Sequence, residues 1–272
     1  MRIKDWYREN KKHFNSSELN FIFKSFGIDS LVFLSRGGNH LLDKKQAEKL
    51  DKIKADRLKG VPLALSLERE EFFGFTFKVN KDTLIPRPET ELLTEAAKAL
   101  ISKNSLKKIL DLCCGCGNIG ISLDKLITAE LNIYLTDLSS KSLALARENA
   151  VDLGSKVKIV NSDLLSGFKE DSFDLIITNP PYVESEKIKD SLAYEPKLAL
   201  DGGKEGLNLI EKIIVQAYRY LEDRGFLIME FGYGQKKRVE NIIYKNGQYI
   251  IKTWIKDYSN IWRGVILQKN NA

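Results

Sequence analysis

The stretch FDLIITNPPY, residues 173–182, joins a short apolar run to a rigid corner. Its apolar residues, 175–177, form the short β-rich pattern that is typical of a buried strand. The two prolines lack backbone donors and have fixed φ angles, and the residue before a proline is displaced from the helical region. The stretch therefore predicts a core strand that ends in a stiff turn. Taken alone, this turn fits a rigid loop as well as a functional site.

From Pro88 onward the chain alternates between helical and extended patterns. Apolar residues with a period of 3.6 predict helices, and short β-rich runs between them predict strands. The predicted helices cover residues 89–101, 118–127, 140–152, 207–222 and 235–244, and the predicted strands cover 108–112, 132–136, 157–160, 174–178, 226–231, 248–255 and 262–268. This alternation indicates an α/β fold with a mainly parallel sheet. Because the last two strands follow each other directly, we expect one antiparallel edge strand.

The first third of the chain has a different pattern. Residues 1–60 are predicted to be mainly helical, with amphipathic segments at 18–26 and 41–58. Residues 72–79 are predicted to be extended and residues 80–82 to form a turn, which suggests a small hairpin. We therefore expect a helical domain at residues 1–70, a hairpin linker at 71–87 and an α/β domain at 88–272.

Composition is that of an ordinary globular protein, with 43% hydrophobic and 29% charged residues. The apolar runs are too short to span a bilayer and the N-terminus has no apolar signal segment, so we expect a cytoplasmic protein without a membrane partner.

Residues 1–84 contain 17 Lys and Arg against 12 Asp and Glu, whereas residues 85–272 contain 26 against 25. The basic excess fits either a surface for nucleic acid or an acidic partner, or a solvated lysine-rich helix face.

Three cysteines, Cys113, Cys114 and Cys116, lie within four positions. This spacing is not that of a disulfide framework. A zinc site would need a fourth ligand, and the two histidines, His13 and His40, are far away in sequence. We therefore expect small packing residues and no metal site.

Polar residues follow three predicted strands, at the edge of the sheet where α/β proteins bind ligands. The segment DLCCGCGN, residues 111–118, opens a helix, and Gly115 and Gly117 permit tight turns close to a ligand. Asp137 ends the next strand, where an acid can accept hydrogen bonds from both ribose hydroxyls. Asp163, with Leu164 beside it, follows the third strand and is placed to contact an adenine.

A glycine-rich loop followed by a ribose-binding acid is found with NAD and with S-adenosylmethionine. Residues 115–120 formally match the dinucleotide pattern G-x-G-x-x-G. Asp111, however, would repel a pyrophosphate, whereas it suits the ammonium group of a methionine moiety. The sequence therefore favours S-adenosylmethionine over NAD, and a helix-capping role for Asp137 is the structural alternative. The expected cofactor contacts are Asp111, Cys113, Cys114, Gly115, Cys116, Gly117, Asp137, Asp163, Leu164 and Asn179.

Several motifs together resemble one family. The 111–120 loop, Asp137 and Asn-Pro-Pro-Tyr at 179–182 are similar to class I methyltransferases that modify planar amino or amide nitrogens. Three further segments resemble motifs of the HemK/PrmC family. They are LIPRPETE at 84–91, EPKLALDGGKEGL at 195–207, and DY at 257–258 with RGV at 263–265. The resemblance extends from about residue 58 to residue 267. Cys113 stands where many methyltransferases have glycine, and we expect a minor backbone adjustment there.

The resemblance implies a class I methyltransferase fold: a Rossmann-like mixed seven-stranded sheet with a small N-terminal helical domain that recognises substrate. HemK/PrmC proteins transfer the methyl group of S-adenosylmethionine to N5 of the glutamine in the Gly-Gly-Gln motif of class 1 peptide-chain release factors, and S-adenosylhomocysteine is the product. By this resemblance Asn179, Pro180 and Tyr182 would act in catalysis, and these three with Pro181 would bind the substrate.

Two related activities stay open, because the same acceptors fit any planar NH₂ group. The target could be a glutamine of a ribosomal protein, or an exocyclic amino group of DNA or RNA. The segment 87–91 resembles the release-factor branch better. Nucleic acid is not expected as a partner, because the sequence shows no target-recognition domain, zinc finger or aromatic-basic RNA module.

Overall fold

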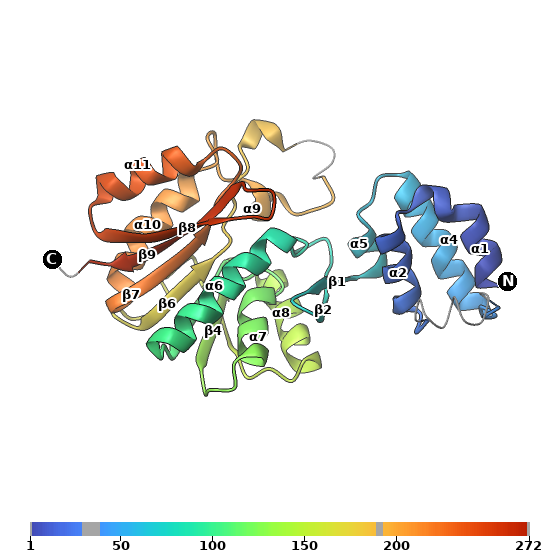
Figure 1. Cartoon of the computed structure of the whole chain (residues 1–272), viewed down its shortest axis with the longest axis horizontal. Coiled ribbons are helices and arrows are strands. Elements are labelled where there is room, and N and C mark those ends of the chain that lie inside the picture. The colour runs from blue at the N-terminus through green and yellow to red at the C-terminus, as the bar shows by residue number, and fades with distance from the viewer. Residues whose placement is uncertain (1, 29–38, 189–192, 271–272) are drawn as a thin grey trace. The chain divides into compact units, whose positions relative to one another are not determined.

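The structure, a computed structural model, describes residues 2–28, 39–188 and 193–270 (Figure 1). By its internal contacts the chain divides into two compact units, Met1–Arg69 and Glu70–Ala272. Each unit has a hydrophobic core of its own.

The smaller unit is helical, as the sequence predicts for residues 1–60. Asn15 with Glu18, and Asp43 with Gln46, form reciprocal capping boxes that fix the starts of two helices. Trp6, Ile22 and Leu50 are among the side chains buried where the helices meet. The elements are α1 (Ile3–Asn10), the 3₁₀ helix η1 (Lys11–His13), α2 (Ser16–Ser25), α4 (Lys44–Leu58) and α5 (Leu63–Leu67).

A two-stranded hairpin, β1 (Arg69–Phe72) and β2 (Phe75–Lys78), begins the larger unit. The turn predicted at residues 80–82 is present, but it follows β2 and does not join the two strands. The strands are joined at Phe73-Gly74, where φ is +52° and +79°. Two consecutive positive φ angles are what a tight hairpin requires. Phe72 and Phe77 are buried in the core of this unit, and the Lys78 N–H donates to Asn149 Oδ1 at 2.8 Å. The hairpin, expected as a linker, is thus packed into the larger unit.

Seven strands within the described residues form one mixed sheet in the order β5-β4-β3-β6-β7-β9-β8. The first five in this order are parallel, and β9 is antiparallel to both of its neighbours. The sequence predicts an antiparallel strand at the edge of the sheet. In the structure the antiparallel strand is β9, which lies one position inside the edge. Residues 264–267 of β9 are all buried, which explains why β9 and not the half-exposed β8 pairs with β7. The strands are β3 (Lys108–Leu112), β4 (Asn132–Asp137), β5 (Lys158–Asn161), β6 (Phe173–Thr178), β7 (Leu221–Glu230), β8 (Tyr249–Lys256) and β9 (Trp262–Lys269).

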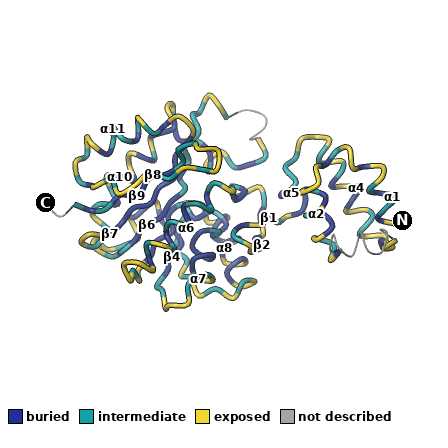
Figure 2. Tube along the Cα trace, viewed as in Figure 1, coloured by how far each residue is buried: buried dark blue, intermediate teal, exposed yellow. Residues whose placement is uncertain are grey.

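Helices cover both faces of the sheet. Successive strand residues point to opposite faces, so Ile109 packs with α6 (Pro88–Asn104), α7 (Asn118–Leu126) and α8 (Ser140–Asp152), and Leu110 packs with α10 (Asn208–Tyr220) and α11 (Lys236–Asn246). Figure 1 shows these two groups of helices, and Figure 2 shows the buried strands between them. The predicted α/β fold is confirmed. The helix predicted at 207–222 ends earlier, at Tyr220, and β7 starts directly after it.

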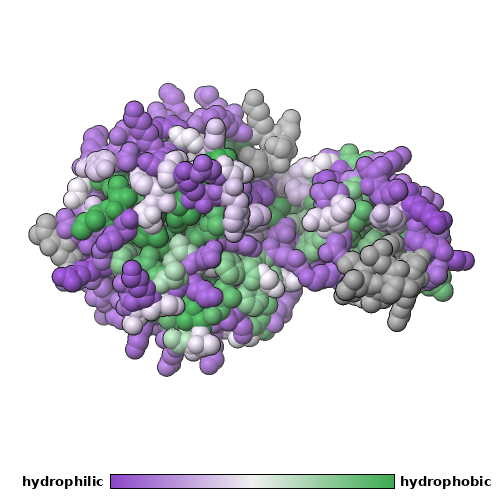
Figure 3. Space-filling model, in the orientation of Figure 1, coloured by the Kyte–Doolittle hydropathy of each residue, from purple (hydrophilic) through white to green (hydrophobic). Residues whose placement is uncertain are grey.

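The long segment after β6 contains two short elements, η2 (Ser185–Lys187) and α9 (Lys197–Leu200). On the face shown in Figure 3, hydrophilic side chains surround smaller apolar areas. Of the helices in the described part of the chain, none is long and apolar enough to cross a membrane.

Candidate active site

The carboxyl ends of β3, β4, β5 and β6 border one cavity in the larger unit. Parallel strands place the loops that follow them at the same edge of the sheet. The cavity contains about 1100 Å³ of free space, which includes open solvent at its mouth. Eight of the residues expected at the site line it: Cys113, Cys114, Gly115, Asp137, Asp163, Leu164, Asn179 and Pro181.

The loop between β3 and α7 bends through left-handed backbone at three positions. The φ angles are +60° at Cys113, +55° at Gly115 and +84° at Gly117. Glycine adopts this conformation freely, whereas a residue with a Cβ does so at a cost of about 1–2 kcal/mol. The conformation accounts for the glycine that many methyltransferases have where this chain has cysteine. A Cβ at Gly117 would lie 2.8 Å from Ile121 Cδ1.

Asp137 connects two of the loops at the cavity. Its Oδ2 accepts from the Gly115 N–H at 2.9 Å and its Oδ1 from the Ser139 N–H at 2.8 Å. Burial raises the pKa of Asp137, and these backbone donors oppose the shift. The N-cap of α8 is Ser139, whose hydroxyl accepts from the Ser142 N–H at 3.1 Å. Asp137 is therefore not the cap, and each carboxylate oxygen keeps a second acceptor position.

Asp111 is fully buried beside the cavity but does not line it. Its Oδ2 accepts from the Gly120 N–H at 2.8 Å, whereas Oδ1 has no hydrogen-bond partner among residues 2–28, 39–188 and 193–270. Burial raises the pKa of Asp111 to about 7. An unpartnered carboxylate oxygen at this depth is costly, and a cationic group at the cavity would offset that cost.

The corner after β6 is held by hydrogen bonds to two distant elements. Asn179 Nδ2 donates to Thr90 Oγ1 at 3.0 Å, whereas Asn179 Oδ1 is buried and has no partner within the described parts of the chain. Tyr182 donates its hydroxyl to Glu230 Oε1 at 2.8 Å and does not line the cavity. Asn179 is thus a cavity-lining residue whose amide oxygen is unsatisfied among the described residues. Four other residues expected at the site are also absent from its lining: Asp111, Cys116, Gly117 and Pro180.

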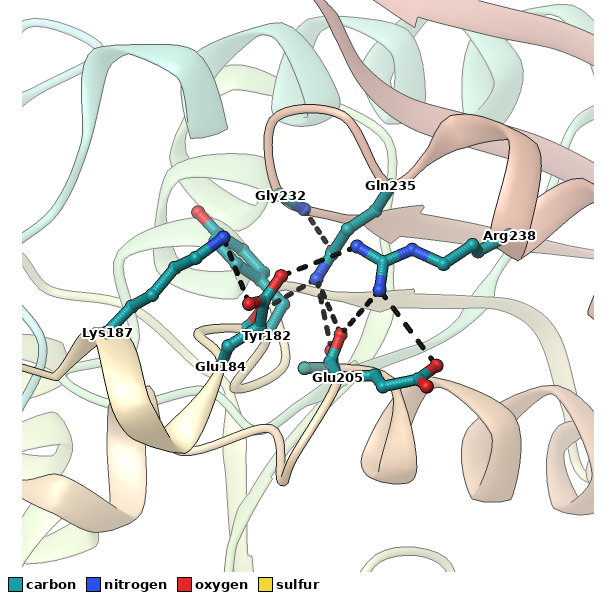
Figure 4. A network of polar contacts seen from close by, with 8 residues as sticks. Tyr182, Glu184, Lys187, Glu205, Gly232, Gln235 and Arg238 are labelled. Atoms are coloured by element: carbon teal, nitrogen blue, oxygen red, sulfur yellow. Dashed lines mark hydrogen bonds and ion pairs between the residues drawn. The ribbon is translucent and has the colours of Figure 1, made fainter.

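Gln235 joins the corner to the loop after β7, as Figure 4 shows. Its Nε2 donates to the Tyr182 carbonyl oxygen at 2.9 Å, and its Oε1 accepts from the Gly232 N–H at 2.7 Å. Arg238 lies beside it, with its guanidinium 3.5 Å from a Glu184 carboxylate oxygen and 3.9 Å from a Glu205 carboxylate oxygen. One buried amide and one partly exposed cation therefore fix the start and the end of the 182–206 segment.

Comparisons with known proteins agree with this geometry. Residues 89–196 match the family described as Methyltransferase small domain. The chain is 36% identical to the release factor glutamine methyltransferase of Thermodesulfovibrio yellowstonii over 100% of both chains. This chain belongs to the release factor glutamine methyltransferase family. The protein of that name from Borreliella burgdorferi is 40% identical over 81% of this chain and 76% of its own length.

The fold of this family member is shared with more distant solved structures. A methyltransferase from Pyrococcus furiosus aligns with a TM-score of 0.52 and 19% identity, over 84% of this chain and 100% of its own. The predicted class I methyltransferase fold, with its mixed seven-stranded sheet, is confirmed.

The three cysteines of this family member are free thiols. Burial raises the pKa of Cys116 to about 12 and that of Cys113 further, so these thiols stay protonated at neutral pH. No cluster of three or more potential metal ligands occurs in the described residues.

Several residues that organise the site of this family member were not predicted from the sequence. Glu195 is buried, accepts from the Ile85 N–H at 2.8 Å and forms an ion pair with Arg87, so it joins the segments 84–91 and 195–207. Thr90 lies in the LIPRPETE motif at 84–91, but the sequence predicted no role for its side chain. Glu230 is a single acid in the apolar run 226–231, and an acid in such a run signals a buried, paired group. Gln235 gave no comparable signal.

Proposed function

We propose that this protein transfers a methyl group from S-adenosylmethionine to N5 of the glutamine in the Gly-Gly-Gln motif of class 1 peptide-chain release factors. The observation that carries the proposal is the buried Asn179 Oδ1, which has no partner in the described part of the chain and belongs to a residue that lines the cavity. The full-length similarity to a protein named release factor glutamine methyltransferase supports the choice of substrate.

The residues around the cavity fit S-adenosylmethionine. Asp137, Asp163 and Leu164 line the cavity. Asp137 would offer its remaining acceptor positions to ribose hydroxyls, and Asp163 and Leu164 would contact adenine. The unpartnered Asp111 Oδ1 suits an ammonium group. Bound at this site, the cofactor supplies a methyl group activated by a sulfonium centre. Asp111 and Asp137 would also disfavour a pyrophosphate, which argues against NAD.

Asn179 and Pro180 supply what an amide nitrogen needs to react. The lone pair of an amide is delocalised into its carbonyl, so the nitrogen is a weak nucleophile. Two fixed acceptors, Asn179 Oδ1 and the Pro180 carbonyl oxygen, would each take one N–H of the substrate amide and orient its nitrogen. They would also stabilise positive charge on the nitrogen as the new N–C bond forms. Orientation of this kind contributes up to roughly 7–11 kcal/mol in favourable cases.

Replacing Asn179 tests this role. Asn179→Ala removes one acceptor and leaves Asp137 and Asp163 in place, so we expect kcat to fall by about 100-fold or more, with a smaller effect on cofactor affinity. The measurement is transfer of labelled methyl to a release factor, with titration calorimetry for S-adenosylmethionine and for NAD. A variant that keeps the wild-type kcat would contradict the acceptor role.

The choice of substrate is tested in the same assay. A release factor and its Gly-Gly-Gln→Gly-Gly-Ala variant are compared with a ribosomal protein fraction and with DNA. We expect label only in the intact release factor. Labelling of the Gly-Gly-Ala variant, of ribosomal protein or of DNA would overturn the assignment of the substrate. Tight binding of NAD without binding of S-adenosylmethionine would overturn the assignment of the cofactor.

A further inference from the structure

A chain of three hydrogen bonds connects Asn179 to the interior of the larger unit. Asn179 Nδ2 donates to Thr90 Oγ1 at 3.0 Å, and Thr90 Oγ1 donates to Glu230 Oε2 at 2.8 Å. The other oxygen of Glu230 accepts from the Tyr182 hydroxyl at 2.8 Å. Thr90 and Glu230 are each about 99% buried, so water does not compete for these bonds.

The direction of each bond follows from the number of protons available. At pH 8.5, above the pKa of about 7 of Glu230, the carboxylate is ionised and only accepts, so the single hydroxyl proton of Thr90 must point to Glu230. Thr90 Oγ1 can then only accept from Asn179, and it selects the NH₂ end of that amide. The oxygen end of Asn179, a residue that lines the cavity, is consequently left without a partner among the described residues. Without this constraint, a rotation of about 180° would exchange the oxygen for a donor.

We propose that Thr90 and Glu230 are positioning residues that set the orientation of the Asn179 amide, so that the site presents an acceptor and not a donor to the substrate NH₂. This inference rests on the acceptor role proposed above for Asn179. A donor at that position would face two substrate N–H groups, which is repulsive. Neither residue needs to touch the reacting atoms.

The two residues lie on rigid elements and not on the corner itself. Thr90 is in the first turn of α6, and Glu230 is the last residue of β7, which is hydrogen-bonded to β6 and β9. A group on a helix or strand is held more accurately than one on a loop, and hydrogen bonds from such groups hold a functional side chain in one rotamer. Tyr182, at the other end of the corner, bonds to the same carboxylate. The carboxylate therefore fixes the corner at two points.

Substitutions at Thr90 separate orientation from packing. Thr90→Val keeps the shape and removes the hydroxyl, so we expect kcat to fall by about 10- to 100-fold, with cofactor affinity changed by less than about threefold. Thr90→Ser restores the hydroxyl and should recover kcat to within about threefold of wild type. Thr94→Val is the matched control, because Thr94 is equally buried in α6 and its hydroxyl bonds only to the Thr90 carbonyl oxygen at 3.3 Å. Glu230→Gln, whose amide can donate to Thr90 or accept from it, should give an intermediate kcat.

The outcomes distinguish this inference from the proposed function. All variants are assayed at pH 8.5, with cofactor affinity and thermal unfolding as checks of folding. The inference is overturned if Thr90→Val and Glu230→Gln keep the wild-type kcat while Asn179→Ala is inactive, or if Thr90→Ser is as slow as Thr90→Val. Should Thr90→Val fail to fold, Glu230→Gln and Thr90→Ser decide the question. An active Asn179→Ala would instead remove the proposed acceptor role.

Discussion

Glu230 and Asp111 are carboxyl groups that are almost completely buried at the site. Burial is the main cause that raises the pKa of each to about 7, and hydrogen bonds from Thr90 and Tyr182 to Glu230 only partly oppose it. A group that remains partly protonated near neutral pH makes the stability of the protein depend on pH.

For Glu230 the sign follows from its ordinary pKa of 4.5 in the unfolded chain. Between about pH 4.5 and pH 7 the unfolded chain loses this proton and the folded protein keeps it, so the free energy of unfolding falls as pH rises. Glu230→Gln removes the titration. We therefore expect the unfolding free energy of the wild type to fall relative to that of Glu230→Gln by about 1 kcal/mol per pH unit between pH 5 and pH 7. Denaturant unfolding at pH 5, 6, 7 and 8 measures the difference.

The difference in unfolding free energy between the wild type and Glu230→Gln cancels the contributions of the other titrating groups. These include Asp111 and the acids whose pKa is lowered by ion pairs, such as Asp257. Above about pH 8 both states of the wild type are ionised at Glu230, so the difference should become constant. Two curves that stay parallel from pH 5 to pH 8 would show that the pKa of Glu230 is not raised.

At the scale of elements, the segment 182–206 depends on Gln235, the N-cap of α11 (Figure 4). Gln235→Ala would leave the Tyr182 carbonyl oxygen and the Gly232 N–H without their partner. An unsatisfied buried group costs roughly 1–3 kcal/mol, so we expect that loss in the free energy of unfolding. We also expect kcat to fall by about 10-fold, because Asn179 lies at the same corner.

Arg238→Ala is the matched control for Gln235→Ala. It removes two partly exposed ion pairs of the same network, with Glu184 and Glu205, and pairs of this kind contribute at most about 1 kcal/mol. Both variants are compared by denaturant unfolding and by methyl transfer. Equal effects of the two substitutions would mean that the amide of Gln235 has no special part in holding the corner.

The elements themselves were largely predictable from local patterns. The strand at 174–178 and the helices at 118–127 and 140–152 follow from short apolar runs and helical periodicity, and the structure confirms them. The inner position of β9 was not predictable in this way. Strand order depends on which strand can be buried on both faces, and that is a property of the whole sheet. The turn at Phe73-Gly74 was missed because phenylalanine is unusual at positive φ.

The candidate site was predictable only where its residues follow strand ends. Asp137, Asp163 and Asn179 were found because parallel strands gather their carboxyl ends at one edge. The partners that orient them come from far away in sequence. The Asn179–Thr90 bond joins residues 89 positions apart, and the Thr90–Glu230 bond joins residues 140 positions apart. No local pattern encodes such contacts, so they had to be read from the structure.

At the scale of the whole molecule, the net charge belongs to one unit. Met1–Arg69 contains 15 Lys and Arg against 9 Asp and Glu, and Glu70–Ala272 contains 28 against 28. The unit that holds the cavity is therefore neutral overall, and the excess of +6 lies on the helical unit. Charge concentrated on one surface accelerates encounter with a partner of opposite charge. We propose that the helical unit contacts the release factor.

Reversing charges on α4 tests this proposal. In Lys44→Glu/Lys45→Glu/Lys52→Glu, all three positions are exposed, so the fold should tolerate the change. We expect KM for the release factor to rise by about 10-fold and to lose salt sensitivity, because each exposed charge pair contributes roughly 0.2–1 kcal/mol. Since the cavity lies in the other unit, kcat and cofactor affinity should stay unchanged. Lys237→Glu/Lys245→Glu/Lys252→Glu makes the same charge change on exposed positions of the neutral unit. If this control raises KM equally, net charge and not the helical unit attracts the substrate.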